Sequence, residues 1–272
     1  MPTFPPDDPD VLALTGVGVV AGGKDLIRDV DWRVRRGERW VVLGPNGAGK
    51  STLLHVAAAY RLPTRGVARV LGSRLGRIDM RDLRRRIGYT SAELERRLDG
   101  RLLVRDAVLT GRDAMLTRWR PRDCPAATAR AEALLEELGL SGLAGRLLAS
   151  LSEGERRRVH LARSLVAEPE LLLVDEPAAG LDIAGREHLV ALLERLAASD
   201  LSAAVFVTHH LEEVPPGFTH ALLLRDGRVV AQGPLDESLT AEPLSACFGL
   251  PLIVHREEGR YWARRAGSPV PG

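Results

Sequence analysis

Short runs of apolar residues alternate with amphipathic stretches along most of the chain, which predicts an α/β architecture with a parallel sheet flanked by helices. Wholly apolar runs are typical of strands buried on both faces, and they occur at Trp40–Leu43, Leu171–Val174 and Ala203–Val207. Between the last two runs, leucines at 189, 192, 193 and 196 have the i, i+3, i+4, i+7 spacing of one apolar helix face. We therefore expect a helix between these two strands.

Two segments near the ends of the chain have strand patterns of another kind. Alternating residues at Val11–Val20 and Ile27–Val34 predict an antiparallel sheet ahead of the parallel one. Asp226-Gly227 between two apolar runs predicts a hairpin. Residues 247–264 alternate around a Glu-Gly pair and predict a second hairpin, which we expect Trp262 to pack against the protein.

Helical patterns dominate residues 92–150, and none of the runs there is typical of a main-sheet strand. The clearest helix extends from about Pro125 to Leu138, and we expect this region to be an inserted helical subdomain. Residues 1–10 contain four prolines and are expected to be a disordered lead. Residues 11–240 are then one domain, and residues 241–272 a C-terminal extension.

Composition excludes several classes of protein. The chain has 272 residues, 45% of them apolar, and a net charge of +2, which gives no strong nucleic-acid signal. No stretch approaches the roughly 20 apolar residues of a spanning helix, and the acidic, proline-rich start is unlike a signal peptide. We expect a cytoplasmic protein, unless a partner holds it at a membrane. Cys124 and Cys247 lie far apart and indicate neither a disulfide framework nor a zinc site.

A glycine-rich segment follows the first buried strand and opens a helix expected from Lys50 to about Ala59. It matches the phosphate-loop pattern GxxxxGK[ST], and its members are Gly44, Pro45, Asn46, Gly47, Ala48, Gly49, Lys50 and Ser51. Glycines let consecutive backbone N–H groups point at phosphate oxygens, and the helix N-terminus adds positive charge. Lys50 is placed to reach the β- and γ-phosphates, Ser51 to ligate Mg²⁺, and Thr52 to bond an earlier phosphate.

Two adjacent carboxylates, Asp175 and Glu176, end the second buried strand. Ligands bind at the carboxyl ends of strands in open parallel sheets. We expect Asp175 to hold Mg²⁺ through water and Glu176 to act as the general base toward an attacking water.

The segment LSEGE at residues 151–155, with RRRVHLARSL after it, resembles the signature helix of ABC-type ATPases. The resemblance extends from about Val11 to Gly233, with the motifs in the family's order. It implies that two cassettes dimerise head to tail around two ATP molecules. The phosphate loop of one chain and Ser152, Gly154 and Glu155 of the other would contact each ATP. Asp182 would link the two sites, and His209 would contact the γ-phosphate. We interpret Arg156–Arg158 as a solvated helix face.

Three positions differ from the family pattern. Ala21 stands where an aromatic residue usually stacks on adenine, which leaves base selectivity open. Ser91 or Ala92 stands where a glutamine normally senses Mg²⁺ and couples to the membrane partner. Glu153 replaces the central glycine of the signature, and we expect its carboxylate to face solvent.

The sequence thus favours an ATP-binding and ATP-hydrolysing cassette subunit that powers transport through a separate transmembrane permease, by resemblance. The alternative is a soluble ATPase switch in DNA repair, translation or assembly, which the missing glutamine favours. A binding module with little turnover is disfavoured by Glu176. A complete set of catalytic residues makes a homodimer possible, while a heterodimer, the cargo and the direction of transport stay open.

Overall fold

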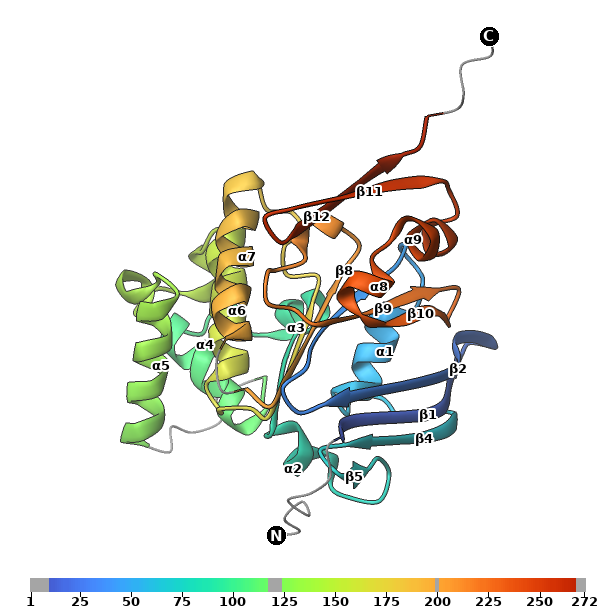
Figure 1. The fold of residues 1–272 in the computed structure, drawn as a ribbon. Helices are drawn as coiled ribbons and strands as arrows, with labels where there is room; N and C mark the ends of the chain where they lie inside the picture. Colours follow the sequence, from blue (N-terminus) through green and yellow to red (C-terminus); the bar gives the residue numbers. More distant parts are fainter. Residues whose placement is uncertain (1–9, 117–123, 199–200, 268–272) are drawn as a thin grey trace.

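Figure 1 shows the computed structural model of the chain, which describes residues 10–116, 124–198 and 201–267. The expected disordered lead therefore lies outside the described residues, except for Asp10, which begins a strand. Two sheets form the body of the molecule, and helices cover the larger sheet on both faces (Figure 1). The α/β architecture expected from the hydrophobic pattern is confirmed.

The larger sheet has six strands in the order β10-β9-β3-β8-β7-β6. Neighbours from β9 to β6 are parallel, and only β10 is antiparallel to its neighbour. The strands are β3 (Arg39–Leu43), β6 (Ile87–Thr90), β7 (Leu171–Asp175), β8 (Ala203–Thr208), β9 (His220–Arg225) and β10 (Arg228–Pro234). The three wholly apolar runs are β3, β7 and β8, each buried at every position.

The second sheet is antiparallel, as expected, in the order β2-β1-β4-β5. Its strands are β1 (Asp10–Ala21), β2 (Lys24–Arg35), β4 (Arg65–Val70) and β5 (Ser73–Arg74). The turn between β1 and β2 is Gly22-Gly23, where both φ angles are positive, at 56° and 74°. Ala21 therefore ends a strand directly before a glycine turn, as the sequence indicated.

Helices connect the strands of the larger sheet. Helix α1 (Lys50–Ala57) follows β3, α2 (Met80–Arg84) precedes β6, and α7 (Ile183–Ala197) links β7 to β8. Between β6 and β7 lie α3 (Ala92–Arg97), α4 (Val104–Leu109), α5 (Pro125–Glu137) and α6 (Glu153–Leu165), with 3₁₀ turns at Thr110–Asp113, Ser141–Leu143 and Leu148–Ser150. The described part of residues 92–150 contributes no strand to either sheet.

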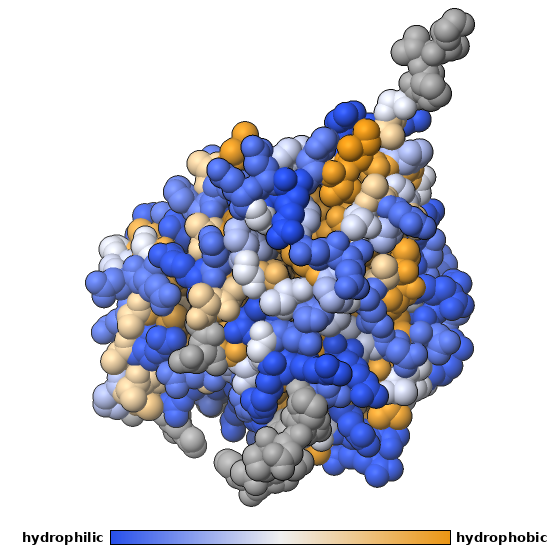
Figure 2. Space-filling view, in the orientation of Figure 1, coloured by the Kyte–Doolittle hydropathy of each residue, from blue (hydrophilic) through white to orange (hydrophobic). Residues whose placement is uncertain are grey.

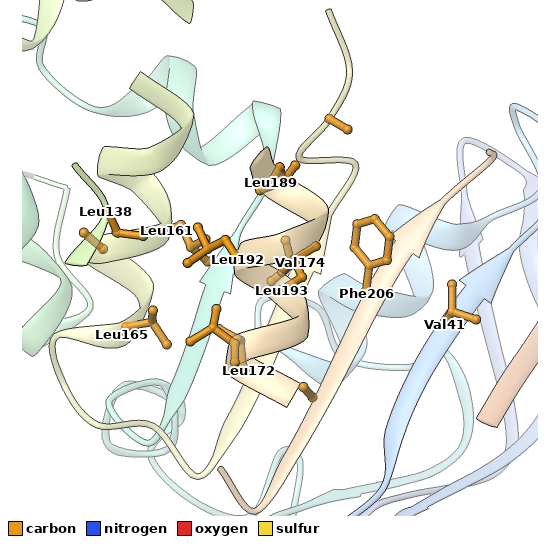
Figure 3. Close-up of a cluster of buried hydrophobic side chains, with 14 of the residues drawn as sticks. Val41, Leu138, Leu161, Leu165, Leu172, Val174, Leu189, Leu192, Leu193 and Phe206 are labelled. Carbon is orange, nitrogen blue, oxygen red and sulfur yellow. The ribbon is translucent and has the colours of Figure 1, made fainter. Parts of the chain in front are cut away.

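The core has two halves because successive residues of each buried strand point to opposite faces of the sheet. Leu172, Val174 and Phe206 face the leucines of α7 (Figure 3). The predicted stripe of α7 is buried at Leu189, Leu192, Leu193 and Leu196. The intervening strand residues, such as Leu173 and Val205, face α1 and the antiparallel sheet. Because the parallel strands are packed on both faces of the sheet, their carboxyl ends are held in place.

Both predicted hairpins are present. Asp226 and Gly227 take φ angles of 50° and 75° between β9 and β10. After α8 (Leu235–Ser238) and α9 (Ala241–Phe248), β11 (Leu252–Glu257) and β12 (Arg260–Arg265) form the C-terminal hairpin.

The expectation that Trp262 packs this hairpin down is wrong. Trp262 is 38% exposed and stacks on His255 of the paired strand, whereas Tyr261 is 3% exposed and belongs to the core. Because side chains alternate along a strand, only one of two neighbours can face the protein. Figure 2 shows hydrophobic surface beside hydrophilic surface over the part of the molecule where the hairpin lies.

Candidate functional site

The phosphate loop joins the end of β3 to the start of α1. A Cβ atom at Gly44 would lie 2.1 Å from the Leu224 carbonyl oxygen, and one at Gly49 would lie 2.6 Å from the Leu26 carbonyl oxygen. Gly49 also has a φ angle of 103°, so these two positions require glycine for both space and conformation. The loop is therefore held tightly between β2, β9 and α1.

Lys50, the first residue of α1, is 5% exposed and its ammonium reaches back over the loop. Its Nζ atom donates to the carbonyl oxygens of Gly44 at 2.8 Å and Pro45 at 3.2 Å. Nζ also lies 3.5 Å from Oε1 of Glu176. The structure thus brings together the loop lysine and the carboxylate that the sequence placed in one site.

Glu176 follows β7 directly, and its carboxylate lies between two nitrogen groups. His209, directly after β8, places Nδ1 at 3.2 Å from the same Oε1 atom that faces Lys50. The backbone of Glu176 has a φ angle of 47°, a left-handed conformation that costs a non-glycine residue of order 1 kcal/mol or more. Its N–H donates to the Val207 carbonyl at 2.9 Å, which ties this turn to β8. Such local strain fits a carboxylate held in one position for chemistry.

Asp175 ends β7 and is 7% exposed. Burial raises the pKa of its carboxyl to about 6, and the hydroxyl of Ser51 and the charge of Lys50 oppose that rise. Among the described residues, nothing donates a hydrogen bond to its Oδ1 atom. A buried carboxylate with a free oxygen beside a serine hydroxyl is a donor set suited to Mg²⁺. The residues therefore fit this ion, with its remaining ligands drawn from phosphate and water.

The signature segment forms the N-terminus of α6. Ser152 is the N-cap, and its hydroxyl accepts from the Glu155 N–H at 3.3 Å. The Glu155 carboxylate in turn accepts from the Ser152 N–H and hydroxyl, both at 2.8 Å, and these bonds lower the pKa of Glu155. This reciprocal capping box fixes the start of the helix, with Gly154 in its first turn.

The interpretation of Arg156–Arg158 as a solvated face is wrong, most clearly at Arg157. This residue is 9% exposed, and its Nη1 atom donates to the Glu176 carbonyl at 3.3 Å. Its Nη2 atom donates to the Glu153 carboxylate at 2.9 Å. Arg156 and Arg158 are partly buried too, and Arg158 donates to the Leu138 carbonyl at 3.1 Å.

Glu153, the charged residue in the signature segment, forms an ion pair with Arg157 of the same helix. The Glu153 side chain is 60% exposed, in agreement with the expectation that it faces solvent, and it lies one helical turn before Arg157. The pair joins the signature helix to the backbone of Glu176, a relationship that the sequence pattern did not show.

Asp182 is the N-cap of α7, where its carboxylate accepts from the Gly185 N–H at 2.7 Å. The residue is exposed, and Ile183 beside it is 73% exposed. Ile183 is thus an exposed aliphatic side chain next to a residue expected to contact a second cassette.

Ser91, one of the two residues at the expected glutamine position, caps a helix. It is the N-cap of α3 and 4% exposed, and its hydroxyl accepts from the Leu94 N–H at 3.2 Å. Ala92 is the first residue of that helix. The Ser91 hydroxyl caps this helix, and Ala92 has no polar side chain that could replace a glutamine.

Comparison with known proteins agrees with this site. The model of the ABC transporter family matches residues 27–179. An ABC transporter ATP-binding protein of Bacillus subtilis, YlmA, is 38% identical over 260 residues, which cover 94% of this chain and 97% of the relative.

Solved structures with a similar fold include a chain from an ABC transporter and isolated cassettes. An inward-facing metal-chelate type ABC transporter matches with a TM-score of 0.73 and 26% identity, over 95% of this chain and 97% of the other. A cassette solved as a dimer in a post-hydrolysis state with ADP and phosphate has a TM-score of 0.71 and 25% identity, over 82% and 98%.

These relatives favour a transporter ATPase over a soluble ATPase switch. Within the described ranges, no helix is both long and apolar enough to cross a membrane. The phosphate loop, the acidic strand end, His209 and the signature helix lie in one α/β framework that these relatives share. The chain belongs to the ABC transporter family and is an ATP-binding, ATP-hydrolysing cassette.

Proposed function

We propose that Glu176 is the general base of ATP hydrolysis in this cassette and that His209 orients it and the attacking water. The observation that carries this proposal is the position of one carboxylate oxygen, 3.2 Å from His209 Nδ1 and 3.5 Å from Lys50 Nζ. A base held by a second side chain is the usual arrangement for activating a nucleophile. Water attacks the γ-phosphorus, its proton passes to Glu176, and ADP leaves.

The phosphate loop binds the triphosphate. Its members from Gly44 to Gly49, except Pro45, offer backbone N–H groups, Lys50 contacts the β- and γ-phosphates, and Thr52 contacts an earlier phosphate. Ser51 and Asp175 hold Mg²⁺, with Asp175 acting through water. When bound, the ion would supply positive charge that stabilises the charge developing on the phosphates.

The second half of each site comes from another copy of the chain. Ser152, Gly154 and Glu155 open α6, and their N–H groups and hydroxyl meet the γ-phosphate of the partner's ATP. Ser152 exchanges its bond to Glu155 for one to phosphate in that state. Asp182, exposed beside Ile183, contacts the partner and links the two sites. A homodimer with two active sites follows.

The dimer is proposed to drive a separate transmembrane permease from the cytoplasmic face of the membrane. A cassette with a similar fold is part of a solved metal-chelate type transporter, which supports this placement. In this proposal, residues 11–240 make up the ATPase domain, with a helical subdomain at about 92–150. Residues 241–272 are an extension of it.

Partner capture tests the permease. The tagged Glu176→Gln chain is purified from its host in mild detergent with ATP and Mg²⁺, and a tagged Lys50→Ala chain is the matched control. We expect a polytopic membrane protein in matched amount with Glu176→Gln and less of it with the control. Ribosomes, DNA-bound factors or soluble proteins alone would contradict a transporter role.

A further inference from the structure

The C-terminal hairpin packs against the turn that follows His209. Strand β12 contacts the 3₁₀ turn η4 (Leu211–Glu213), which begins two residues after His209. Tyr261 anchors the hairpin, since its ring is buried and its hydroxyl donates to Asp236 at 3.0 Å. The catalytic scheme above uses no residue of this hairpin.

Arg260, the first residue of β12, connects two elements of the candidate site. Its guanidinium donates to both carboxylate oxygens of Glu187, at 2.8 Å and 3.1 Å, and to the carbonyl oxygen of Glu212. Glu187 lies in the second turn of α7, the helix that Asp182 caps, and Glu212 lies in η4. Bidentate arginine–carboxylate pairs have a fixed geometry, so this contact limits movement between α7 and η4.

The neighbouring charges extend the connection to the histidines. The Arg186 guanidinium lies 3.6 Å from a carboxylate oxygen of Glu212, and the same oxygen lies 3.6 Å from Nδ1 of His210. The rings of His209 and His210 are 4.1 Å apart between centroids. Side chains of the hairpin, α7 and η4 thus form one continuous cluster that ends at His209.

We propose that Arg260 is a positioning residue, through which the C-terminal hairpin holds the turn behind His209 against α7 and so sets the rate of ATP hydrolysis. The proposal rests on the role proposed for His209. Small displacements of a positioned group cost up to about 100-fold in rate. Arg260 contacts no part of the phosphate loop, so its loss alters turnover and leaves ATP affinity in place.

The test compares Arg260→Gln with Arg256→Gln in the full-length chain. Arg256 is a matched control because it lies on the same hairpin and pairs with Asp236 at 2.7 Å, away from α7 and η4. We expect kcat to fall about 10-fold in Arg260→Gln, with KM for ATP within about twofold of wild type. Arg256→Gln should keep wild-type kcat. Equal kcat values in the two variants would overturn the proposal.

Two further variants separate positioning from general destabilisation. Arg260→Glu and Glu187→Arg should each lower kcat, and the double variant should recover part of it, because the charge pair is restored in reverse. No recovery in a folded double variant would count against the proposal.

A final comparison separates this proposal from the role of His209. His209→Ala alone should lower kcat, and adding Arg260→Gln should then have no further effect. If the two losses multiply, Arg260 does not act through His209. If His209→Ala keeps full activity, the role of His209 itself is wrong, and the proposal for Arg260 falls with it.

Discussion

The Nδ1 atom of His209 lies 3.2 Å from Oε1 of Glu176, although the two residues are 33 positions apart in the sequence. Parallel pairing of β7 with β8 brings their carboxyl ends to the same edge of the sheet, which explains the contact. The same oxygen faces Lys50 at 3.5 Å. In the proposed scheme, phosphate binds Lys50 in place of Glu176, and the Glu176 carboxylate then becomes available to the attacking water.

Lys50→Ala should weaken ATP binding strongly. A buried ammonium that bonds phosphate is worth about 1.5–3 kcal/mol in charged hydrogen bonds, which corresponds to a loss of about 10- to 100-fold or more in affinity. Calorimetric titration with ATP measures this, and thermal unfolding shows whether the variant remains folded. A folded variant with wild-type affinity would be inconsistent with the phosphate-loop assignment.

Arg157→Gln should lower both stability and turnover, because it leaves the Glu176 carbonyl without its donor and Glu153 without its partner. Loss of one partner of a buried charged contact costs about 1–3 kcal/mol. Arg158→Gln is the control, since Arg158 also bonds a backbone carbonyl but not that of Glu176. Denaturant unfolding and steady-state hydrolysis are measured for both variants. A larger loss of kcat in Arg158→Gln than in Arg157→Gln would refute the link between the Arg157–Glu176 contact and turnover.

Ser91→Ala should lower the free energy of unfolding by about 1 kcal/mol, the usual effect of losing an N-cap. The Mg²⁺ concentration for half-maximal hydrolysis should stay as in wild type, because the Ser91 hydroxyl already accepts from Leu94. Ser91→Asn, which keeps a cap acceptor, is the control for stability. A severalfold rise in the Mg²⁺ requirement would instead make Ser91 a metal sensor.

His160 should make the folded chain sensitive to acid. Burial, with Arg163, Arg156 and Arg157 nearby, lowers the pKa of this imidazole to about 3, so it stays neutral in the fold while the unfolded chain takes up a proton near pH 6.5. Unfolding therefore binds protons, and stability is lost as pH falls. Between about pH 7 and about pH 5 the loss amounts to about 2 kcal/mol.

Denaturant unfolding at both pH values checks this in wild type and in His160→Leu. The leucine variant should lose about 2 kcal/mol less than wild type over that range. An identical pH dependence in the two proteins would show that His160 does not titrate on unfolding.

Local pattern was sufficient to predict the elements that carry the site. The strands that end at Leu43, Asp175 and Thr208 are apolar at most positions, since each is buried on both faces. The phosphate loop was predictable because eight consecutive residues match the GxxxxGK[ST] pattern directly after a buried strand. The role of Glu176 is a prediction from its place at a strand end, and the role of His209 is a prediction from family resemblance.

Contacts between distant segments were beyond sequence reasoning. Arg157 and Arg260 read as ordinary surface arginines in a chain with 38 basic residues, and only the fold shows that they bond Glu176 and Glu187. Tyr261 and Trp262 are adjacent aromatics in an alternating segment, so the sequence did not decide which one faces the core. At each of these positions, the three-dimensional structure was needed to identify the partner or the burial of the side chain.

The most direct test of the account is the mass of the Glu176→Gln chain in solution with ATP and Mg²⁺, measured by light scattering after size exclusion. The account predicts a particle of twice the 29.5 kDa chain mass that retains unhydrolysed ATP, because binding is intact and the base is missing. Lys50→Ala, treated in the same way, should remain a monomer. A Glu176→Gln chain that hydrolyses ATP as fast as wild type, or that binds ATP as a monomer, would contradict it.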